Sequence, residues 1–162
     1  MGLSKSVSDD LVSLKDGIIE ELERIKKMAA SDLSIDDFEL DTEVLKTPKL
    51  HTKYNDVFTD HTLKLKDLYA LKEKVKLERW KYYQGKQTDK YYSQNGVIHE
   101  KILKSDIDRY LSADEKLVLV NDIVSAQKAI TDYLERCIKE IQSRNFHCRV
   151  ALDWRKFTSG GV

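Results

Sequence analysis

Residues 49–83, KLHTKYNDVFTDHTLKLKDLYALKEKVKLERWKYY, decide the fold class of this 162-residue chain. Apolar or aromatic side chains recur there every three or four residues, which predicts one amphipathic helix of about 35 residues, roughly 50 Å long. No single small core can bury a helix of that length, so we expect it to pack in a coiled coil or an oligomer. The stripe consists of Leu50, Tyr54, Val57, His61, Leu65, Leu68, Leu71, Val75, Arg79 and Tyr82.

Before this helix, the sequence predicts a second long helix and a connector. Ser8 can cap a helix over residues 9–30, in which apolar side chains recur every three or four residues. Residues 31–47 are acidic and predict a connector with a short helix. Pro48 disfavours helix at the residue before it and suits the first turn of a new helix, so we expect the long helix to start there.

After the long helix, residues 84–97 predict a polar connector, and Ile98 begins an apolar pattern that predicts a helix to Tyr110. Ser112 and Glu115 match a capping box that opens a helix reaching about residue 144. Asn145 is then expected to end that helix in the left-handed conformation. A short separate C-terminal helix is predicted by the spacing of Phe146, Val150, Trp154 and Phe157.

Composition supports an all-α protein. Charged residues make up 35% of the chain, with only six glycines and one proline, which favours long exposed helices and excludes an all-β fold. No apolar stretch approaches the roughly 20 residues that span a bilayer, and no signal peptide is recognisable, so we expect a soluble intracellular protein. Cys137 and Cys148 cannot form a disulfide framework and are expected to be reduced core or interface residues.

Charge is strongly segregated although the net charge is zero. Residues 1–45 carry a net charge of −7, residues 46–109 carry +6, and residues 110–162 carry +1. The basic middle is where a polyanion would bind. The acidic arm is either a contact for a partner, a mimic that competes with a polyanion for the basic segment, or, as we favour, a solvated and solubilising extension.

The sequence contains no motif for catalysis or cofactor binding. We find no glycine-rich phosphate loop, no HExxH and no Ser, His and Asp set with triad spacing. The four histidines are far apart and lack metal-ligand spacing. We therefore expect a protein that is not an enzyme and has no cofactor or metal.

Residues 72–92, KEKVKLERWKYYQGKQTDKYY, carry the strongest functional signal. Cations alternate with Trp80 and four tyrosines, and single-stranded nucleic acid needs this combination because cations neutralise phosphates while aromatic rings stack on unpaired bases. The alternative is that Trp80 and Tyr82 belong to a hydrophobic core, and composition alone leaves both interpretations open.

Several stretches resemble the UvsY family, the recombination mediator proteins of T-even-type bacteriophages. The similarity spans roughly residues 33–160, and the first 30 residues look like an extension. The stretches are LHTKY at 50–54, KLERWKYYQG at 76–85, LSAD at 111–114, IQSRNF at 141–146 and RKF at 155–157.

The resemblance implies a helical protein that forms a ring of six or seven subunits and binds single-stranded DNA. It also implies two further partners, a RecA-like recombinase and the phage single-strand-binding protein that the recombinase replaces, in the cytoplasm of the infected host. A family DNA-binding segment, Leu-Lys-Ala-Arg-Leu, aligns with residues 76–80, where Arg79 matches but Leu77 and Glu78 replace the lysine and alanine.

The sequence and the resemblance together predict three segments and two sets of site residues. Residues 1–47 form the acidic arm and connector, residues 48–110 bind DNA, and residues 111–162 serve oligomerisation. The competing class is a coiled-coil structural or adaptor protein without nucleic-acid binding. The predicted DNA-binding residues are Lys74, Lys76, Arg79, Lys81, Tyr82, Tyr83, Lys86 and Lys90, and the predicted oligomerisation residues are Phe146, Val150, Trp154 and Phe157.

Overall fold

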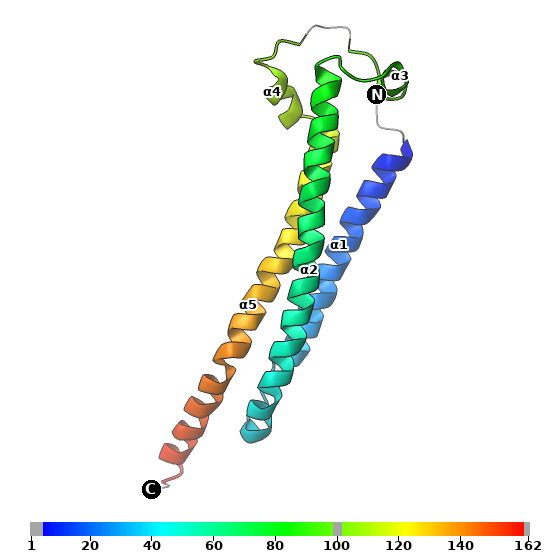
Figure 1. Ribbon diagram of the computed structural model, residues 1–162. Coiled ribbons are helices and arrows are strands. Elements are labelled where there is room, and N and C mark those ends of the chain that lie inside the picture. The colour runs from blue at the N-terminus through cyan, green and yellow to red at the C-terminus, as the bar shows by residue number, and fades with distance from the viewer. Residues whose placement is uncertain (1–4, 99–101, 161–162) are drawn as a thin grey trace. The chain divides into compact units, whose positions relative to one another are not determined.

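The computed structural model of the chain describes residues 5–98 and 102–160, which form helices and contain no strand (Figure 1). The prediction of an all-α fold is confirmed for this part of the chain. In it, no helix has a stretch long and apolar enough to cross a membrane. The helices are α1 (Lys5–Asp32), α2 (Leu40–Tyr83), α3 (Asp89–Asn95), α4 (Ile107–Ser112) and α5 (Glu115–Thr158).

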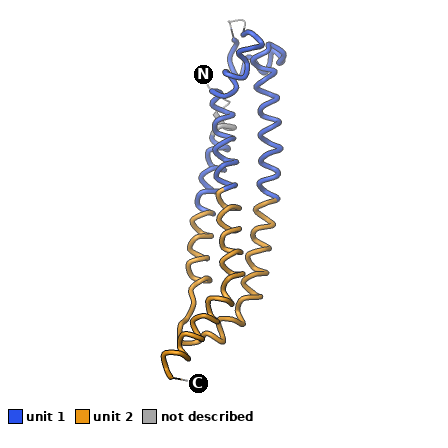
Figure 2. Tube along the Cα trace, turned by 90° about the vertical axis from the view of Figure 1, so that its left-hand side faces the viewer, with its two compact units in different colours: residues 1–21, 63–128 blue, residues 22–62, 129–162 orange. Residues whose placement is uncertain are grey.

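The chain divides into two compact units, coloured separately in Figure 2. Unit 1 comprises residues 1–21 and 63–128, and unit 2 comprises residues 22–62 and 129–162. Each unit draws on more than one of the three predicted segments, so these segments are not separate compact units. The functions assigned to the segments stay predictions.

Unit 1 is built around a small apolar cluster. Val75 of α2, Ile107 and Leu111 of α4, and Leu117 and Val120 of α5 are all buried in it. Partly buried side chains complete the cluster, and one of them comes from α1. These side chains are Leu11, Leu71, Trp80, Tyr83 and Ile102.

Unit 2 is also stabilised by buried apolar side chains, which recur at helical spacing. In α5, Ile130, Leu134 and Ile141 are fully buried, at spacings of four and seven residues. Tyr54 of α2 is also fully buried, and Ile25 of α1 lies in the core as well. The N-terminal helix is therefore packed along one face and is not a freely solvated arm.

Both cysteines lie in the core of unit 2. Cys137 and Cys148 are free and buried, as the sequence predicts. Burial raises the pKa of the Cys137 thiol above its usual value. This keeps the side chain in the neutral thiol form, which is weakly nucleophilic.

The predicted connector and helix start around Pro48 are wrong. Helix α2 begins at Leu40 and continues through Pro48, which is exposed. Proline removes one backbone hydrogen bond in a helix interior, but neighbouring tertiary contacts compensate for it here. Thr47 is buried and donates a hydrogen bond to Asn145 Oδ1 at 2.9 Å, and Glu43 forms a buried ion pair with Arg144.

The predicted helix from Ile98 to Tyr110 is also wrong. Its residues 99–101 lie outside the described residues, residues 102 and 103 are irregular, and helix α4 begins only at Ile107. Ile107 and Leu111, four residues apart, are buried, whereas Leu103 is largely exposed. Ile102 packs against the cluster of unit 1 from irregular backbone, and the regular helix begins only where Ile107 and Leu111 are buried.

The predicted break at Asn145 does not exist. Residues 146–158 are helical as expected, but they continue α5, and no non-glycine residue in the described chain has a positive φ. Arg144 and Cys148, also four residues apart, are buried and extend the α5 stripe past the expected end. Asn145 uses its side chain to bind Thr47 and not to cap the helix.

The Glu43–Arg144 pair makes a testable prediction about acid stability. Hydrogen bonds from Lys46 and Arg144 hold the pKa of the Glu43 carboxyl below its usual value of 4.5. Its contribution is therefore complete above pH 4.5 and is lost as the pH falls, because the unfolded chain binds the proton first. We expect Glu43→Gln to lose less stability than the wild type between pH 5 and pH 3, measured by urea unfolding. An equal loss in both proteins would contradict this.

Candidate nucleic-acid interface

The five predicted DNA-binding lysines are all exposed, and all belong to unit 1. Lys74 and Lys81 of α2 are seven residues apart, which places them on the same side of the helix. Leu77 lies between them and is 54% exposed. This side of α2 therefore presents two cations with the apolar side chain of Leu77 between them.

A second group of cations lies on another side of α2. Lys76 is two residues from Lys74, which rotates it about 200° around the helix. It shares its side of α2 with the partly buried Trp80, over which Lys86 places its ammonium group 5.1 Å from the ring centroid. Lys90 is exposed on α3. The structure therefore does not bring all five lysines onto one face.

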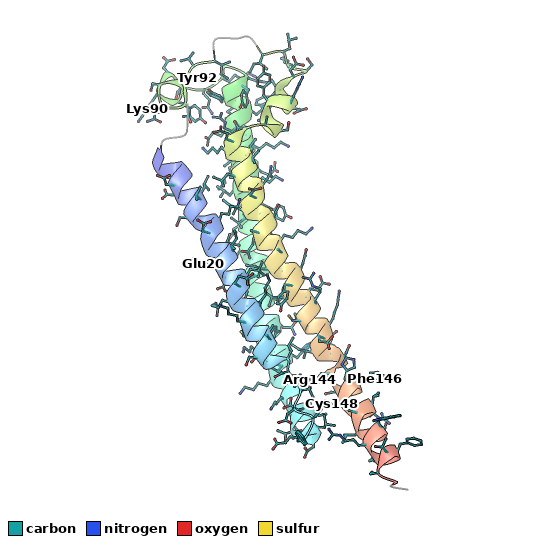
Figure 3. The ribbon with its side chains drawn as sticks, turned by 180° about the vertical axis from the view of Figure 1, so that it is seen from behind. Glu20, Lys90, Tyr92, Arg144, Phe146 and Cys148 are labelled. Carbon is teal, nitrogen blue, oxygen red and sulfur yellow. The ribbon has the colours of Figure 1, made fainter. Side chains whose placement is uncertain are left out.

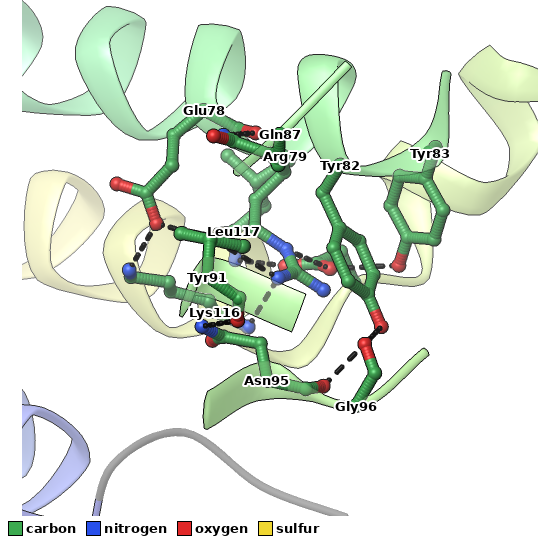
Figure 4. A network of polar contacts seen from close by, with 11 residues as sticks. Glu78, Arg79, Tyr82, Tyr83, Gln87, Tyr91, Asn95, Gly96, Lys116 and Leu117 are labelled. Atoms are coloured by element: carbon green, nitrogen blue, oxygen red, sulfur yellow. Dashed lines mark hydrogen bonds and ion pairs between the residues drawn. The ribbon is translucent and has the colours of Figure 1, made fainter. Parts of the chain in front are cut away.

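Arg79 does not project into solvent like the lysines. Its Nε donates to Asp114 Oδ2 at 2.7 Å, and its Nη1 donates to the Tyr91 hydroxyl at 3.3 Å. The guanidinium carbon lies 4.1 Å from the Tyr82 ring centroid, within cation–π range. Arg79 thus links α2, α3 and the start of α5 from inside unit 1 (Figure 4).

Asp114 is the cap of α5. Its Oδ1 accepts hydrogen bonds from the backbone amides of Lys116 and Leu117, each at 3.1 Å, and its Oδ2 accepts from Arg79 and Tyr83. The predicted capping box is therefore wrong, because Ser112 Oγ donates to the Arg109 carbonyl instead. The residue directly before the helix outcompetes it, since a carboxylate there meets both free amides and the positive end of the dipole.

Glu78 explains one departure from the family segment. Its Oε1 accepts from Lys116 Nζ and from the Tyr91 hydroxyl, both at 2.7 Å. Its backbone carbonyl accepts from Gln87 Nε2 at 2.9 Å (Figure 4). Glu78 therefore fixes the segment after α2 to α5 and does not simply remove a positive charge from the surface.

Tyr82 is the centre of an aromatic cluster and is only 8% exposed. Its ring stacks on Tyr92 with centroids 5.6 Å apart. Its hydroxyl donates to the backbone carbonyls of Asn95 and Gly96 at 3.3 and 3.2 Å. Gly96 has φ of 90°, which suits glycine, and it ends α3 there. The predicted polar connector 84–97 thus contains a short helix that the sequence analysis missed.

The pKa shifts follow from these contacts. Burial and, to a smaller extent, the hydrogen bond to Asp114 raise the pKa of Tyr83 to about 12. Burial and the hydrogen bond to Glu78 raise the pKa of Tyr91 to about 12 as well. Burial opposes the charge on Arg79, but hydrogen bonds with Tyr91 and Asp114 outweigh it and raise its pKa. Burial likewise opposes the charge on Glu78, yet Lys116 and Tyr91 lower its pKa. The network stays charged and its phenols keep their protons at neutral pH.

Two grooves border this network within unit 1. One has a volume of about 440 Å³ and exposes edges of Arg79 and Tyr83, and the other has a volume of about 650 Å³ and is bordered by Lys86 and Lys104. Tyr82 and Tyr83 line both. Across the described residues, no group of three or more His, Cys, Asp or Glu side chains could hold a metal ion. The surface around the grooves offers exposed cations and aromatic edges.

Asp114 allows a prediction with a matched control. Asp114→Ala removes the cap of α5 and leaves Arg79 and Tyr83 without their carboxylate, so we expect a loss of about 2 kcal/mol or more in unfolding free energy. Asp114→Asn keeps a good capping side chain and removes only the charge, so it should lose less. Urea unfolding followed by circular dichroism measures both. Equal losses would contradict a capping role.

The network residues Asp114, Tyr91 and Lys116 were not predicted as part of the site. Asp114 carries a recognisable signal, since it is an acidic residue directly before a helix. Tyr91 lies in the cation-rich and aromatic stretch 72–92, but the sequence does not show its contact with Glu78, 13 residues away. Lys116 carries no signal, because it lies 38 residues from Glu78. The predicted oligomerisation residues lie elsewhere, in the part of α5 that belongs to unit 2.

Comparisons with known proteins match both the sequence and the fold of this chain. A family model described as "Recombination, repair and ssDNA binding protein UvsY" matches residues 28–161. Two crystal forms of the bacteriophage T4 recombination mediator protein UvsY are similar in fold, with TM-scores of 0.74 and 0.73 and 21% sequence identity in both cases. The first alignment covers 84% of this chain and 98% of the other, and the second covers 85% and 96%. A search of curated proteins found no match.

Proposed function

Because this chain belongs to the UvsY family, we propose that it is a recombination mediator that binds single-stranded DNA. The proposed DNA-binding surface is the part of unit 1 that contains residues 74–90. The observation that carries the proposal is the set of exposed lysines around a fixed aromatic and polar network. Lysines neutralise backbone phosphates without regard to base sequence, and partly exposed aromatic rings stack on unpaired bases. Both requirements of single-strand binding are met on one compact unit.

We assign different roles to the predicted DNA-binding residues. Lys74, Lys76, Lys81, Lys86 and Lys90 contact phosphates, because they are exposed. Tyr83 is partly exposed and lines both grooves, so it serves with Trp80 as a stacking surface. Arg79 and Tyr82 are positioning residues, since their polar groups already have partners inside the protein.

The mediator works through binding energy and requires no bond chemistry from this chain. Several copies in a ring hold one strand at several sites, and tethering can raise affinity by about 10² to 10⁴ over a single site. A strand held in this way is withdrawn from the phage single-strand-binding protein and offered to a RecA-like recombinase. This places the protein's action in the cytoplasm of the infected bacterium.

A salt titration tests the proposal against the adaptor alternative. The wild-type protein is mixed with a labelled oligothymidylate, and the dissociation constant is measured between 0.05 and 0.3 M salt. We expect the logarithm of the association constant, the reciprocal of the measured constant, to fall linearly with log salt, by about 0.7 for each phosphate contact. An adaptor protein without a nucleic-acid role would show no binding at the lowest salt concentration.

Leu77 gives a gain-of-function prediction. It is exposed between Lys74 and Lys81 and stands where the family has lysine. Leu77→Lys should add one phosphate contact, tighten oligothymidylate binding several-fold at 0.1 M salt and steepen the salt slope by about 0.7. Leu63→Lys, also on an exposed part of α2, adds the same charge away from the cluster and serves as the control. An equal gain in both variants would mean that net charge alone matters.

A further inference from the structure

The C-terminal part of α5 is largely exposed. Within the described residues, which end at Gly160, Cys148 is the last buried one, and nearly all of those beyond it are exposed (Figure 3). Trp154 is 65% exposed and Phe157 is 77% exposed, and their rings lie 5.9 Å apart. Large apolar side chains in such a patch mark an interaction site.

A second exposed apolar pair lies near the start of α2, also in unit 2. Phe38 is 93% exposed and Leu45 is 79% exposed. Phe38 is held in a turn, because its amide donates to Asp36 Oδ1 at 2.8 Å. Leu45 lies between Glu43 and Thr47, which face α5, so it points to the opposite side of α2.

The two patches carry opposite charges. The helix end that bears Trp154 and Phe157 has one acidic residue among several exposed cations, which are Arg149, Arg155 and Lys156. The surroundings of Phe38 are acidic, and the exposed carboxylates there are Asp36, Asp37, Glu39 and Asp41. Beside Leu45, Lys46 and Lys49 are exposed as well, so the patch as a whole keeps a smaller excess of negative charge. Complementary charges around apolar centres favour one pairing and one orientation.

We propose that the aromatic basic end of α5 in one copy docks on the acidic Phe38 and Leu45 patch of the next copy. Because donor and acceptor are different surfaces, the contact is heterologous, and it closes a ring when the rotation between neighbouring copies divides a full turn. Leu45 faces away from the α5 segment that contacts α2 in the same chain, so a second copy is the occupant that fits. This inference rests on the self-assembly in the proposed function and identifies its acceptor surface.

Two half-interface variants test the proposal by complementation. The acceptor variant carries Phe38→Ser and Leu45→Ser, and the donor variant carries Trp154→Ser and Phe157→Ser. All four residues are exposed, so we expect wild-type circular dichroism in both variants. Each variant alone should need at least about a 30-fold higher concentration than the wild type to assemble, as loss of a central interface residue typically requires. Mixed in equal amounts, the two should form a dimer and nothing larger, since one intact surface remains on each.

The controls separate this inference from the proposed function. A variant with Val12→Ser and Ile19→Ser removes exposed apolar surface from α1 and should assemble like the wild type. An acceptor variant that assembles normally, or a mixture that stays monomeric, would overturn the proposed contact. Oligothymidylate binding by the wild type is measured in parallel. Its absence would refute DNA binding but leave the interface in place, whereas binding by a wild type that never assembles would refute the interface alone.

Discussion

Replacing Lys74, Lys76 and Lys81 together with alanine is expected to weaken oligothymidylate binding by about 10²-fold at 0.15 M salt. All three side chains are exposed on α2. Each lost phosphate contact lowers the salt slope on single strands by about 0.7, so three contacts lower it by about 2. Fluorescence anisotropy at several salt concentrations gives the affinity and the slope in one experiment.

A control with the same change in charge distinguishes contact from net charge. Lys27, Lys49 and Lys139 are exposed and belong to unit 2. Their replacement by alanine should leave the salt slope unchanged and weaken binding only slightly. If both triple variants lose the same affinity and slope, the lysines of α2 are not the phosphate-binding site.

Arg144→Met is expected to lower the free energy of unfolding by about 3 to 5 kcal/mol. Arg144 and Glu43 form an ion pair in which both side chains are 3% exposed. Arg144 also donates hydrogen bonds to the backbone carbonyls of Leu33 and Ser34, each at 3.0 Å. Removing Arg144 leaves the buried Glu43 carboxylate to its remaining ion pair with Lys46 and leaves both carbonyls without this donor, and breaking a buried pair in this way is strongly destabilising. Urea unfolding at a fixed protein concentration measures the loss, because assembly also affects stability.

The double variant Glu43→Gln with Arg144→Met separates the charge from the packing. It removes both charges, so it should be more stable than Arg144→Met alone. Lys46 still lies beside position 43 at the surface and bonds Glu43 at 2.5 Å in the wild type. If Arg144→Met lost less than about 1 kcal/mol, this pair would not anchor the start of α2 to α5.

The long helices were predictable because their stripes are continuous. The buried residues of α5, such as Val120, Ile130 and Leu134, recur at the spacing that the sequence shows. The errors lie where tertiary contacts override a local signal. Pro48 suggested a helix start, but the buried contacts of Glu43 and Thr47 carry α2 back to Leu40.

The site was only partly predictable for a similar reason. Sequence could identify a segment rich in cations and aromatic residues, but it could not show which side chains have internal partners. Arg79 and Tyr82 bond to groups between 12 and 35 residues away along the chain. The positions of Lys74 and Lys81 could be predicted without knowledge of tertiary contacts, because helical spacing alone places them on the same side of α2.

The most direct test of the account is the native mass of the wild-type protein with and without an oligothymidylate, measured by light scattering in dilute salt. The account predicts a mass equal to that of several subunits, which rises by the mass of bound oligonucleotide. A protein that stays monomeric at micromolar concentration and gains no mass with the oligonucleotide would contradict it.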